Sequence, residues 1–270
     1  MIQEARDAVA AADALIITAG AGMGVDSGLP DFRGTEGFWR EYPVVKKLGL
    51  RFEEMANPRW FEENPRLAWA FYGHRLHLYR DTVPHAGFAM LRESGERKPG
   101  GAFVVTSNVD GQFQKAGFKA DHILEVHGSI HHLQCTKGCQ NSIWSADGTD
   151  ITIDMEQFKA VGELPTCPAC GALARPNILM FGDWGWNSAR EEAQQRNFDG
   201  WFASVVAKDW RIAVIEIGAG SHVPTIRHFS ERVGQMPNAT LIRINPREAF
   251  GPEGTISLDM GALEALREIL

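Results

Sequence analysis

The sequence lacks the features of several large protein classes. None of its apolar stretches approaches the ~18 residues that a membrane-spanning helix needs, so we expect no membrane span. The first twenty residues contain no basic segment followed by an apolar run, so we expect no secretion signal and a cytoplasmic protein. Lys and Arg number 27 against 34 Asp and Glu, and the net charge of −7 disfavours general binding to nucleic acid or to anionic lipid.

Cysteine is also scarce, but the four cysteines form two close pairs. Cys167 and Cys170 have the spacing of a zinc knuckle, and Cys135 and Cys139 are one residue further apart, which is still within the range of zinc sites. In a cytoplasmic chain such clusters hold metal more often than they form disulfides. We therefore expect one structural zinc ion on four thiolates, with two disulfides or free thiols as the alternative. The neighbouring histidines, His131 and His132, are not counted as ligands.

The length of 270 residues and the 44% of hydrophobic residues fit one large α/β domain, or a large domain with a smaller one inserted. Short apolar runs predict buried parallel strands at 14–18, 102–106, 212–217 and 240–244. Each run ends in a polar or glycine-rich turn: GAGMG, SNVDG, GAGS or NPRE. Ligands of open α/β sheets bind beyond the carboxyl ends of the strands, so these four turns predict a cofactor site.

Two stretches interrupt this series of apolar strands and turns. One, near 35–81, is helical, and the other, near 129–176, contains all four cysteines. We predict a Rossmann-like parallel sheet formed by 1–34, 82–128 and 177–270. The other two stretches would form a smaller module over the edge of the sheet, as a helical insertion at 35–81 and a zinc-binding insertion at 129–176.

The segment from Gly20 to Gly34, GAGMGVDSGLPDFRG, is the most informative of these turns. Glycines directly after a strand let the backbone approach a pyrophosphate, although a tight turn without a ligand explains them equally well. The part from Ser27 onward is too rich in glycine and proline for a helix. It predicts a loop, with Asp31, Phe32 and Arg33 exposed, that folds over a bound ligand.

This segment resembles the pattern GAG-x-S-x-x-SGIPDFRG of the sirtuins, the NAD-dependent protein-lysine deacylases. Further motifs follow in that family's order: TSNVDG from Thr106, EVHG from Glu125, ARPNILMFGD from Ala174, GAGSHVP from Gly218 and INPRE from Ile244. The resemblance covers nearly the whole chain. It is to the bacterial type of sirtuin, and it implies a Rossmann-like fold, NAD and an acyl-lysine protein or peptide as substrate.

The resemblance also implies roles for individual residues. His127 would be the general base on the nicotinamide ribose hydroxyls, a role that suits the near-neutral pKa of histidine. Asn108 would act with it, and the acyl group would pass to ADP-ribose as nicotinamide leaves. The cofactor site would comprise Gly20, Ala21, Gly22, Asp31, Phe32, Arg33, Ser107, Asn108, Val109, Asp110, Gly218, Ala219, Gly220, Asn245 and Met260. Phe181 and Gly182 would contact the substrate.

Tyr72 and Arg75 lie three residues apart in a predicted helix and therefore share a face. Together they can hold a carboxylate, but a buried Tyr72 beside a solvated Arg75 is the plainer interpretation. The pair resembles the one in sirtuins that remove succinyl, malonyl and glutaryl groups, and Ala56 matches the small residue that enlarges their acyl pocket. This favours an acidic acyl-lysine substrate, with acetyl-lysine as the alternative.

The chain also departs from the sirtuin pattern. Gly24 replaces Ser, Ser107 replaces Gln, Gln112 and Phe113 replace Leu-His, and Ala219 and Gly220 replace Thr-Ser. Trp184 and Trp186 lie in the expected peptide-binding loop, where they would narrow the groove or form an aromatic wall. NAD glycohydrolase or ADP-ribosyltransferase activity on the same scaffold, and a non-catalytic NAD sensor, remain alternatives. The oligomeric state is not predicted.

Overall fold

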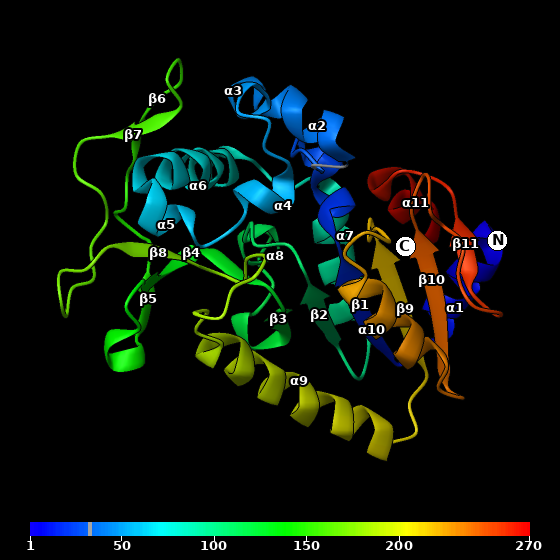
Figure 1. Cartoon of the computed structure of the whole chain (residues 1–270). Helices are drawn as coiled ribbons and strands as arrows, with labels where there is room; N and C mark the ends of the chain where they lie inside the picture. The colour runs from blue at the N-terminus through cyan, green and yellow to red at the C-terminus, as the bar shows by residue number, and fades with distance from the viewer. Residues whose placement is uncertain (32–33) are drawn as a thin grey trace.

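The computed structural model describes residues 1–31 and 34–270, and it contains one large parallel sheet (Figure 1). Its six strands lie in the order β11-β10-β9-β1-β2-β3. Their bounds are β1 Ala14–Ala19, β2 Ala102–Thr106, β3 Ile123–Glu125, β9 Ile212–Ile217, β10 Ala239–Ile244 and β11 Ile256–Leu258. All five neighbouring pairs are parallel. The four strands predicted from the sequence are confirmed, and the order is that of a Rossmann fold.

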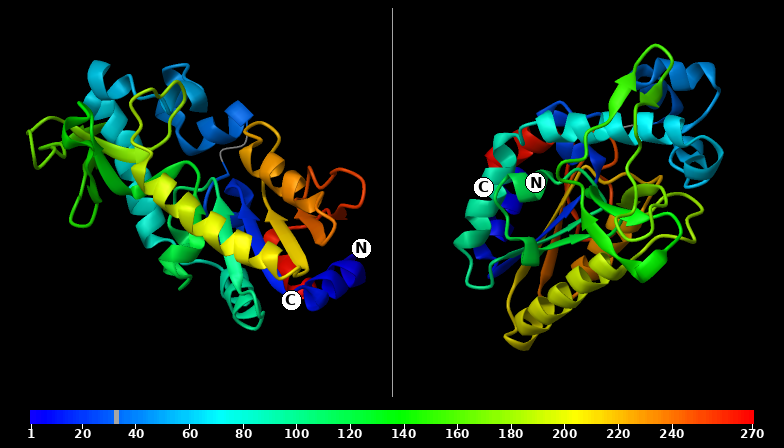
Figure 2. Two further views of the ribbon diagram at one scale, coloured as in Figure 1. Left: turned by 90° about the horizontal axis from the view of Figure 1, so that it is seen from below. Right: turned by 90° about the vertical axis from the view of Figure 1, so that its left-hand side faces the viewer.

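Helices cover both faces of this sheet, which explains why β1 and β9 are buried along their whole length. Leu15 and Ile17 of β1 pack on one face against α1 (Ile2–Ala11), α7 (Ala86–Glu96) and α11 (Ala262–Ile269). Ala14 and Ile16 point to the other face, which is covered by α9 (Ala189–Ala207) and α10 (Thr225–Gly234). Figure 2 shows α9 running along that face. The alternation of side chains along one strand thus supplies two cores.

The smaller module combines short helices with two antiparallel sheets. One sheet has the order β5-β4-β8 and the other pairs β6 with β7. The strands are β4 Gly128–Cys135, β5 Ile143–Ser145, β6 Thr152–Asp154, β7 Lys159–Val161 and β8 Ala174–Ile178. The helices are α2 Gly34–Glu41, α3 Pro43–Lys47, α4 Phe52–Met55, α5 Trp60–Glu63 and α6 Pro65–Asp81. The short helix α8, Gln112–Lys115, and the 3-10 helices η1 Ala21–Ser27, η2 Ala120–His122 and η3 Cys139–Asn141 complete the described chain.

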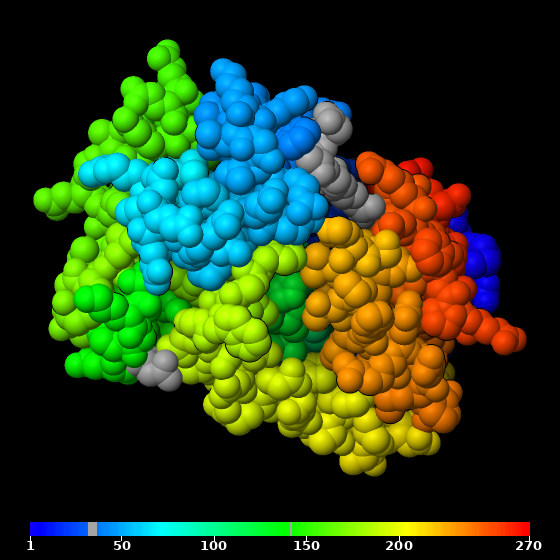
Figure 3. Space-filling model, viewed as in Figure 1, coloured from blue at the N-terminus to red at the C-terminus, as the bar shows by residue number. Residues whose placement is uncertain are grey.

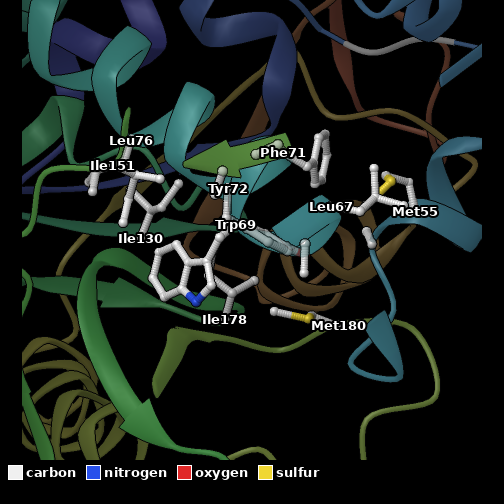
Figure 4. Close-up of a cluster of buried hydrophobic side chains, with 14 of the residues drawn as sticks. Met55, Leu67, Trp69, Phe71, Tyr72, Leu76, Ile130, Ile151, Ile178 and Met180 are labelled. Carbon is white, nitrogen blue, oxygen red and sulfur yellow. The ribbon is translucent and has the colours of Figure 1, made fainter. Parts of the chain in front are cut away.

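Helix α6 forms the centre of this module. The side chain of Asn64 accepts a hydrogen bond from the Leu67 amide at 3.2 Å, and Pro65 occupies the first turn, so the sequence marks where the helix begins. Trp69, Phe71 and Tyr72 are buried in a third core with β4 and β8 (Figure 4). The indole of Trp69 donates to the Ala174 carbonyl of β8 at 3.0 Å, which ties the helix to the cysteine-containing stretch.

The predicted loop after Ser27 is partly confirmed. Gly28, in a left-handed conformation with φ 87°, ends η1, and residues 28–31 contain no helix. The loop is shorter than predicted, because α2 begins at Gly34. Phe32 and Arg33 lie outside the described residues. The boundaries drawn between the sheet domain and the two insertions stay a prediction. Among the described residues, no helix has the length and apolar character needed to cross a membrane.

Candidate active site

The first and third strand-end turns, GAGMG and GAGS, meet where the strand order reverses, between β1 and β9. The amides of Gly20 and Gly22 donate to the carbonyls of Ile217 and Gly218, both at 3.0 Å. A Cβ at Gly22 would lie 2.6 Å from the Gly218 Cα, and one at Gly20 would lie 2.7 Å from the Ala219 Cα. The glycines are therefore required by backbone-on-backbone packing of the two turns, a reason that the pyrophosphate argument did not include.

A cavity of about 900 Å³ opens at this point and extends toward α6. Figure 3 shows the surface around it, where the helical insertion, the segment near residue 183 and the start of α10 surround a recess with strand-end residues at its floor. The predicted site residues that line the cavity are Gly20, Ala21, Asp31, Ala56, Tyr72, Arg75, Ser107, Asn108, Val109, Asp110, His127, Phe181, Gly182, Gly218, Ala219 and Gly220. The structure thus brings together residues from the helical insertion and from all three segments predicted to form the sheet domain.

His127 lies between β3 and β4, where the chain leaves the large sheet. Gly128 has φ 77°, and a Cβ there would lie 2.1 Å from the Asn177 carbonyl oxygen, so only glycine fits this turn. Burial lowers the pKa of His127 below its ordinary value of 6.5, against a hydrogen bond at the Ser107 backbone that raises it. The imidazole is therefore neutral at pH 7 and able to accept a proton.

The turn after β2 supplies further polar groups to the same cavity. The Asn108 side-chain amide donates to the Gly20 carbonyl at 2.9 Å, and its backbone amide donates to the Thr106 hydroxyl at 3.0 Å. Asp110 is buried and accepts a hydrogen bond from the Gln112 amide at 2.9 Å. Burial raises the pKa of Asp110 from 3.8 to about 6, although the Gln112 hydrogen bond lowers it. A carboxyl group whose pKa is shifted in this way is typical of functional sites.

The far end of the cavity lies beside β10. The Asn245 side chain donates to the Ala219 carbonyl at 2.9 Å and therefore supports the GAGS turn that follows β9. Ser221 donates to Glu248 through its amide at 2.9 Å and through its hydroxyl at 2.8 Å. Glu248 lines the cavity and was not among the predicted site residues. Its place as the last residue of the predicted NPRE turn was the available signal.

Three predicted cofactor residues are not among those that line the cavity: Gly22, Asn245 and Met260. Gly22 and Asn245 instead shape the turns that do. Met260 is half-buried and packs against the core between the sheet and α11. Arg33 and Phe32 lie outside the described residues.

The cavity ends in a chamber beside α6. Tyr72 is 1% exposed and stacks on Phe61, with 5.8 Å between the ring centroids, so it belongs to the core and also lines the chamber. Arg75 is 7% exposed, and the interpretation of this residue as a solvated surface charge is wrong. Ala56 accepts a hydrogen bond from the Phe181 amide at 2.9 Å, which joins the chamber to the predicted substrate loop.

Tyr79 also lines the chamber and was missed in the sequence. It lies one turn after Arg75 and two turns after Tyr72, so its spacing on the predicted helix was the signal that could have found it.

The loop after Gly182 is held in a fixed conformation. Gln134 of β4 donates to the Gly185 carbonyl at 2.8 Å and accepts from the Asn187 amide at 3.1 Å. Asp183 pairs with Arg175 of β8 at 2.5 Å. Trp184 is among the residues that line the cavity and is fully exposed, and Trp186 is half-buried. The aromatic wall expected from these two residues stays a prediction.

The four cysteines form one cluster. All four Sγ atoms lie within 4.8 Å of one another, with 3.7 Å between those of Cys135 and Cys170 and 3.4 Å between those of Cys139 and Cys167. Tetrahedral zinc with Zn–S bonds of about 2.3 Å places sulfurs about 3.8 Å apart, whereas a disulfide needs about 2.05 Å. The clustering predicted from the spacing is confirmed, and the disulfide alternative is wrong. Four thiolates fill the coordination of zinc, so this is a structural site.

The comparisons with known proteins agree with this geometry. Residues 20–198, about two thirds of the chain, match the model of the Sir2 family. The chain belongs to the Sir2 family. An NAD-dependent protein deacylase of Thermococcus sibiricus is 34% identical over 204 residues, which cover 73% of this chain and 70% of the relative. An NAD-dependent protein deacylase of Thermus thermophilus is 28% identical over 273 residues, covering 100% of this chain and 94% of the relative.

Solved Sir2 structures share the fold over the full length. A mutant Sir2 homologue in complex with ADP-ribose superimposes with a TM-score of 0.74 and 26% identity, covering 100% of this chain and 95% of the other. A Sir2 homologue in complex with NAD gives a TM-score of 0.74 and 25% identity, covering 99% of this chain and 91% of the other.

Proposed function

We propose that this Sir2 chain is an NAD-dependent protein-lysine deacylase that transfers the acyl group of acyl-lysine to ADP-ribose. The observation that carries the proposal is the single cavity. It joins the two glycine turns at the strand reversal, the neutral base His127, and a buried chamber that contains Arg75. The relatives named above are NAD-dependent protein deacylases, which supports the same activity.

Each part of the cavity has a task in this proposal. NAD supplies the ribosyl group that accepts the acyl oxygen when nicotinamide leaves. The Gly20 and Gly218 turns receive the pyrophosphate, and Glu248, fixed by Ser221, accepts hydrogen bonds from ribose hydroxyls. Asn108 and Asp110 orient the nicotinamide end, and His127 takes a proton from a ribose hydroxyl.

The acyl-lysine enters between the Phe181 loop and the helical insertion. A peptide segment on either side of the lysine lies along this loop, with Trp184 as its aromatic wall. The four thiols must stay reduced to hold zinc, which supports a cytoplasmic location.

We further propose a preference for acidic acyl groups. A guanidinium that is 7% exposed at the end of a cavity is costly to bury without a function, and a carboxylate is its natural ligand. The Tyr72 hydroxyl lies on the same helix face and supplies a second donor. The acetyl group of acetyl-lysine carries no charge that could pair with Arg75.

The test incubates purified protein with NAD and one of three matched peptides carrying succinyl-lysine, acetyl-lysine or unmodified lysine. Products are followed by mass spectrometry. Acyl-ADP-ribose formed only with acylated peptide, and faster with the succinyl peptide, is the expected result. Free ADP-ribose formed without any acyl peptide identifies an NAD glycohydrolase instead. Arg75→Met is expected to slow succinyl turnover selectively; an equal loss with both acylated peptides refutes the acyl preference.

A further inference from the structure

The guanidinium of Arg75 lies inside a group of aromatic rings at the end of the chamber. Its carbon is 5.2 Å from the ring centre of Phe71, 5.4 Å from that of Tyr79 and 5.7 Å from that of Tyr72. Such contacts with ring faces stabilise a cation that has been removed from water. The group also fixes where the charge lies, because the rings come from one helix, α6, and are themselves buried.

Tyr79 makes a more specific contact with Arg75 than the other rings do. Its hydroxyl oxygen accepts hydrogen bonds from Nε of Arg75 at 3.1 Å and from Nη2 at 2.9 Å. Nε and Nη2 form one edge of the guanidinium, an edge that a carboxylate can bind with both oxygens. The Tyr79 oxygen already occupies this edge, so a carboxylate that pairs with Arg75 binds next to the Tyr79 hydroxyl.

The chemistry of a hydroxyl group then gives Tyr79 a second role. A phenol has two acceptor positions and one O–H donor, and both acceptor positions here are taken by Arg75. Burial raises the pKa of Tyr79, so the phenol keeps its proton. Tyr79 lines the cavity, and its O–H group keeps the capacity to donate one hydrogen bond.

We propose that Tyr79 is an acyl-specificity residue, whose hydroxyl holds the Arg75 guanidinium in place and donates its own proton to the carboxylate of an acidic acyl-lysine. The inference rests on the proposed acyl preference and adds the residue that sets the geometry of Arg75.

The chain offers a matched control, because it has three tyrosines and all three lie around Arg75. Tyr42 is as buried as Tyr79, but its hydroxyl is hydrogen-bonded to Nδ1 of His74 at 3.0 Å. Tyr79→Phe and Tyr42→Phe therefore each remove one buried hydroxyl from the same aromatic cluster, and only the first removes a group of the chamber.

Calorimetry without NAD measures how each variant binds two peptides of one sequence, one with succinyl-lysine and one with acetyl-lysine. A hydrogen bond to a charged group is lost in Tyr79→Phe, so its affinity for the succinyl peptide is expected to fall about tenfold or more. Its affinity for the acetyl peptide, and both affinities of Tyr42→Phe, are expected to stay within about twofold. In an Arg75→Met background, Tyr79→Phe is expected to have little further effect, since the two residues act together.

Three results would overturn the assignment of Tyr79. These are an equal loss of affinity for both peptides, no succinyl preference in the unaltered protein, or the same selectivity change in Tyr42→Phe. Circular dichroism checks folding, and Tyr79→Met, which also lacks the hydroxyl, replaces the Phe variant if that one does not fold. Turnover with NAD is measured in parallel. A selective binding defect without any turnover supports the role of Tyr79 while it refutes the deacylase activity.

Discussion

Replacing Asp110 with Asn should make the protein more stable and less active. The side chain is 8% exposed, and burial raises its pKa from 3.8 to about 6. The folded chain therefore binds the Asp110 proton more tightly than the unfolded chain does. The protonated carboxyl contributes its full share to the free energy of unfolding below pH 3.8, and this contribution is lost as the pH rises through 6.

The size of the effect follows from the two pKa values. The difference between about 6 and 3.8 corresponds to about 3 kcal/mol at pH 8, and to about half of that at pH 5. Asparagine carries no charge at either pH and can still accept the hydrogen bond from the Gln112 amide. Asp110→Asn should therefore increase the free energy of unfolding, and the gain should be larger at pH 8 than at pH 5.

Urea unfolding of both proteins at the two pH values measures this gain. Asp7→Asn, which changes an exposed carboxylate of α1, is the control and should show no such pH dependence. Deacylation by Asp110→Asn should fall, because the carboxylate is proposed to orient nicotinamide. An Asn variant that is no more stable than the unaltered protein at pH 8 would refute the reasoning.

Three further predictions concern the turn, the base and the metal. Gly22→Ala places a Cβ 2.6 Å from the Gly218 Cα and should lower the free energy of unfolding, measured with urea, by about 1–3 kcal/mol. Gly200→Ala, which has open space around it in α9, should raise that free energy. Equal effects of the two variants would contradict the packing of the two turns. In the pH profile of kcat/KM, the midpoint of the acid limb should lie below pH 6.5, because burial lowers the pKa of His127. A midpoint above pH 7 would exclude His127 as the base. Elemental analysis of the purified protein should find one zinc ion per chain. Removing the zinc with a chelator should make residues 129–176 exchange their amide hydrogens before the parallel sheet does. A metal-free protein in which residues 129–176 stay protected from exchange would contradict the zinc site.

Much of the fold could be predicted because the strands carry their own signal. The run IAVIEI is apolar on both faces except for Glu216 and is followed directly by Gly218, a pattern typical of a covered parallel strand. The cluster of all four cysteines could be predicted from the spacing within the two pairs, because the geometry of a metal site restricts the spacing of its ligands. Asn108 and His127 could be placed at the cavity because each follows a strand of the same sheet.

Other features depend on contacts that no spacing shows. Gly22 looked like a phosphate contact, but its neighbour is the Gly218 backbone, some 200 residues away in the chain. From its residue type alone Arg75 looked better suited to the surface, but it is buried among the rings of α6. Tyr79 was missed because its hydrogen bonds to Arg75 depend on the side-chain conformation of both residues.

The most direct test of the central claim is the stoichiometry of one reaction. Nicotinamide release and acyl-ADP-ribose formation are measured in the same sample with NAD and a succinyl- or acetyl-lysine peptide. The account predicts one acyl-ADP-ribose and one deacylated lysine for each nicotinamide released, with none of the three products in His127→Ala. Nicotinamide released together with free ADP-ribose while the acyl peptide stays intact would contradict it.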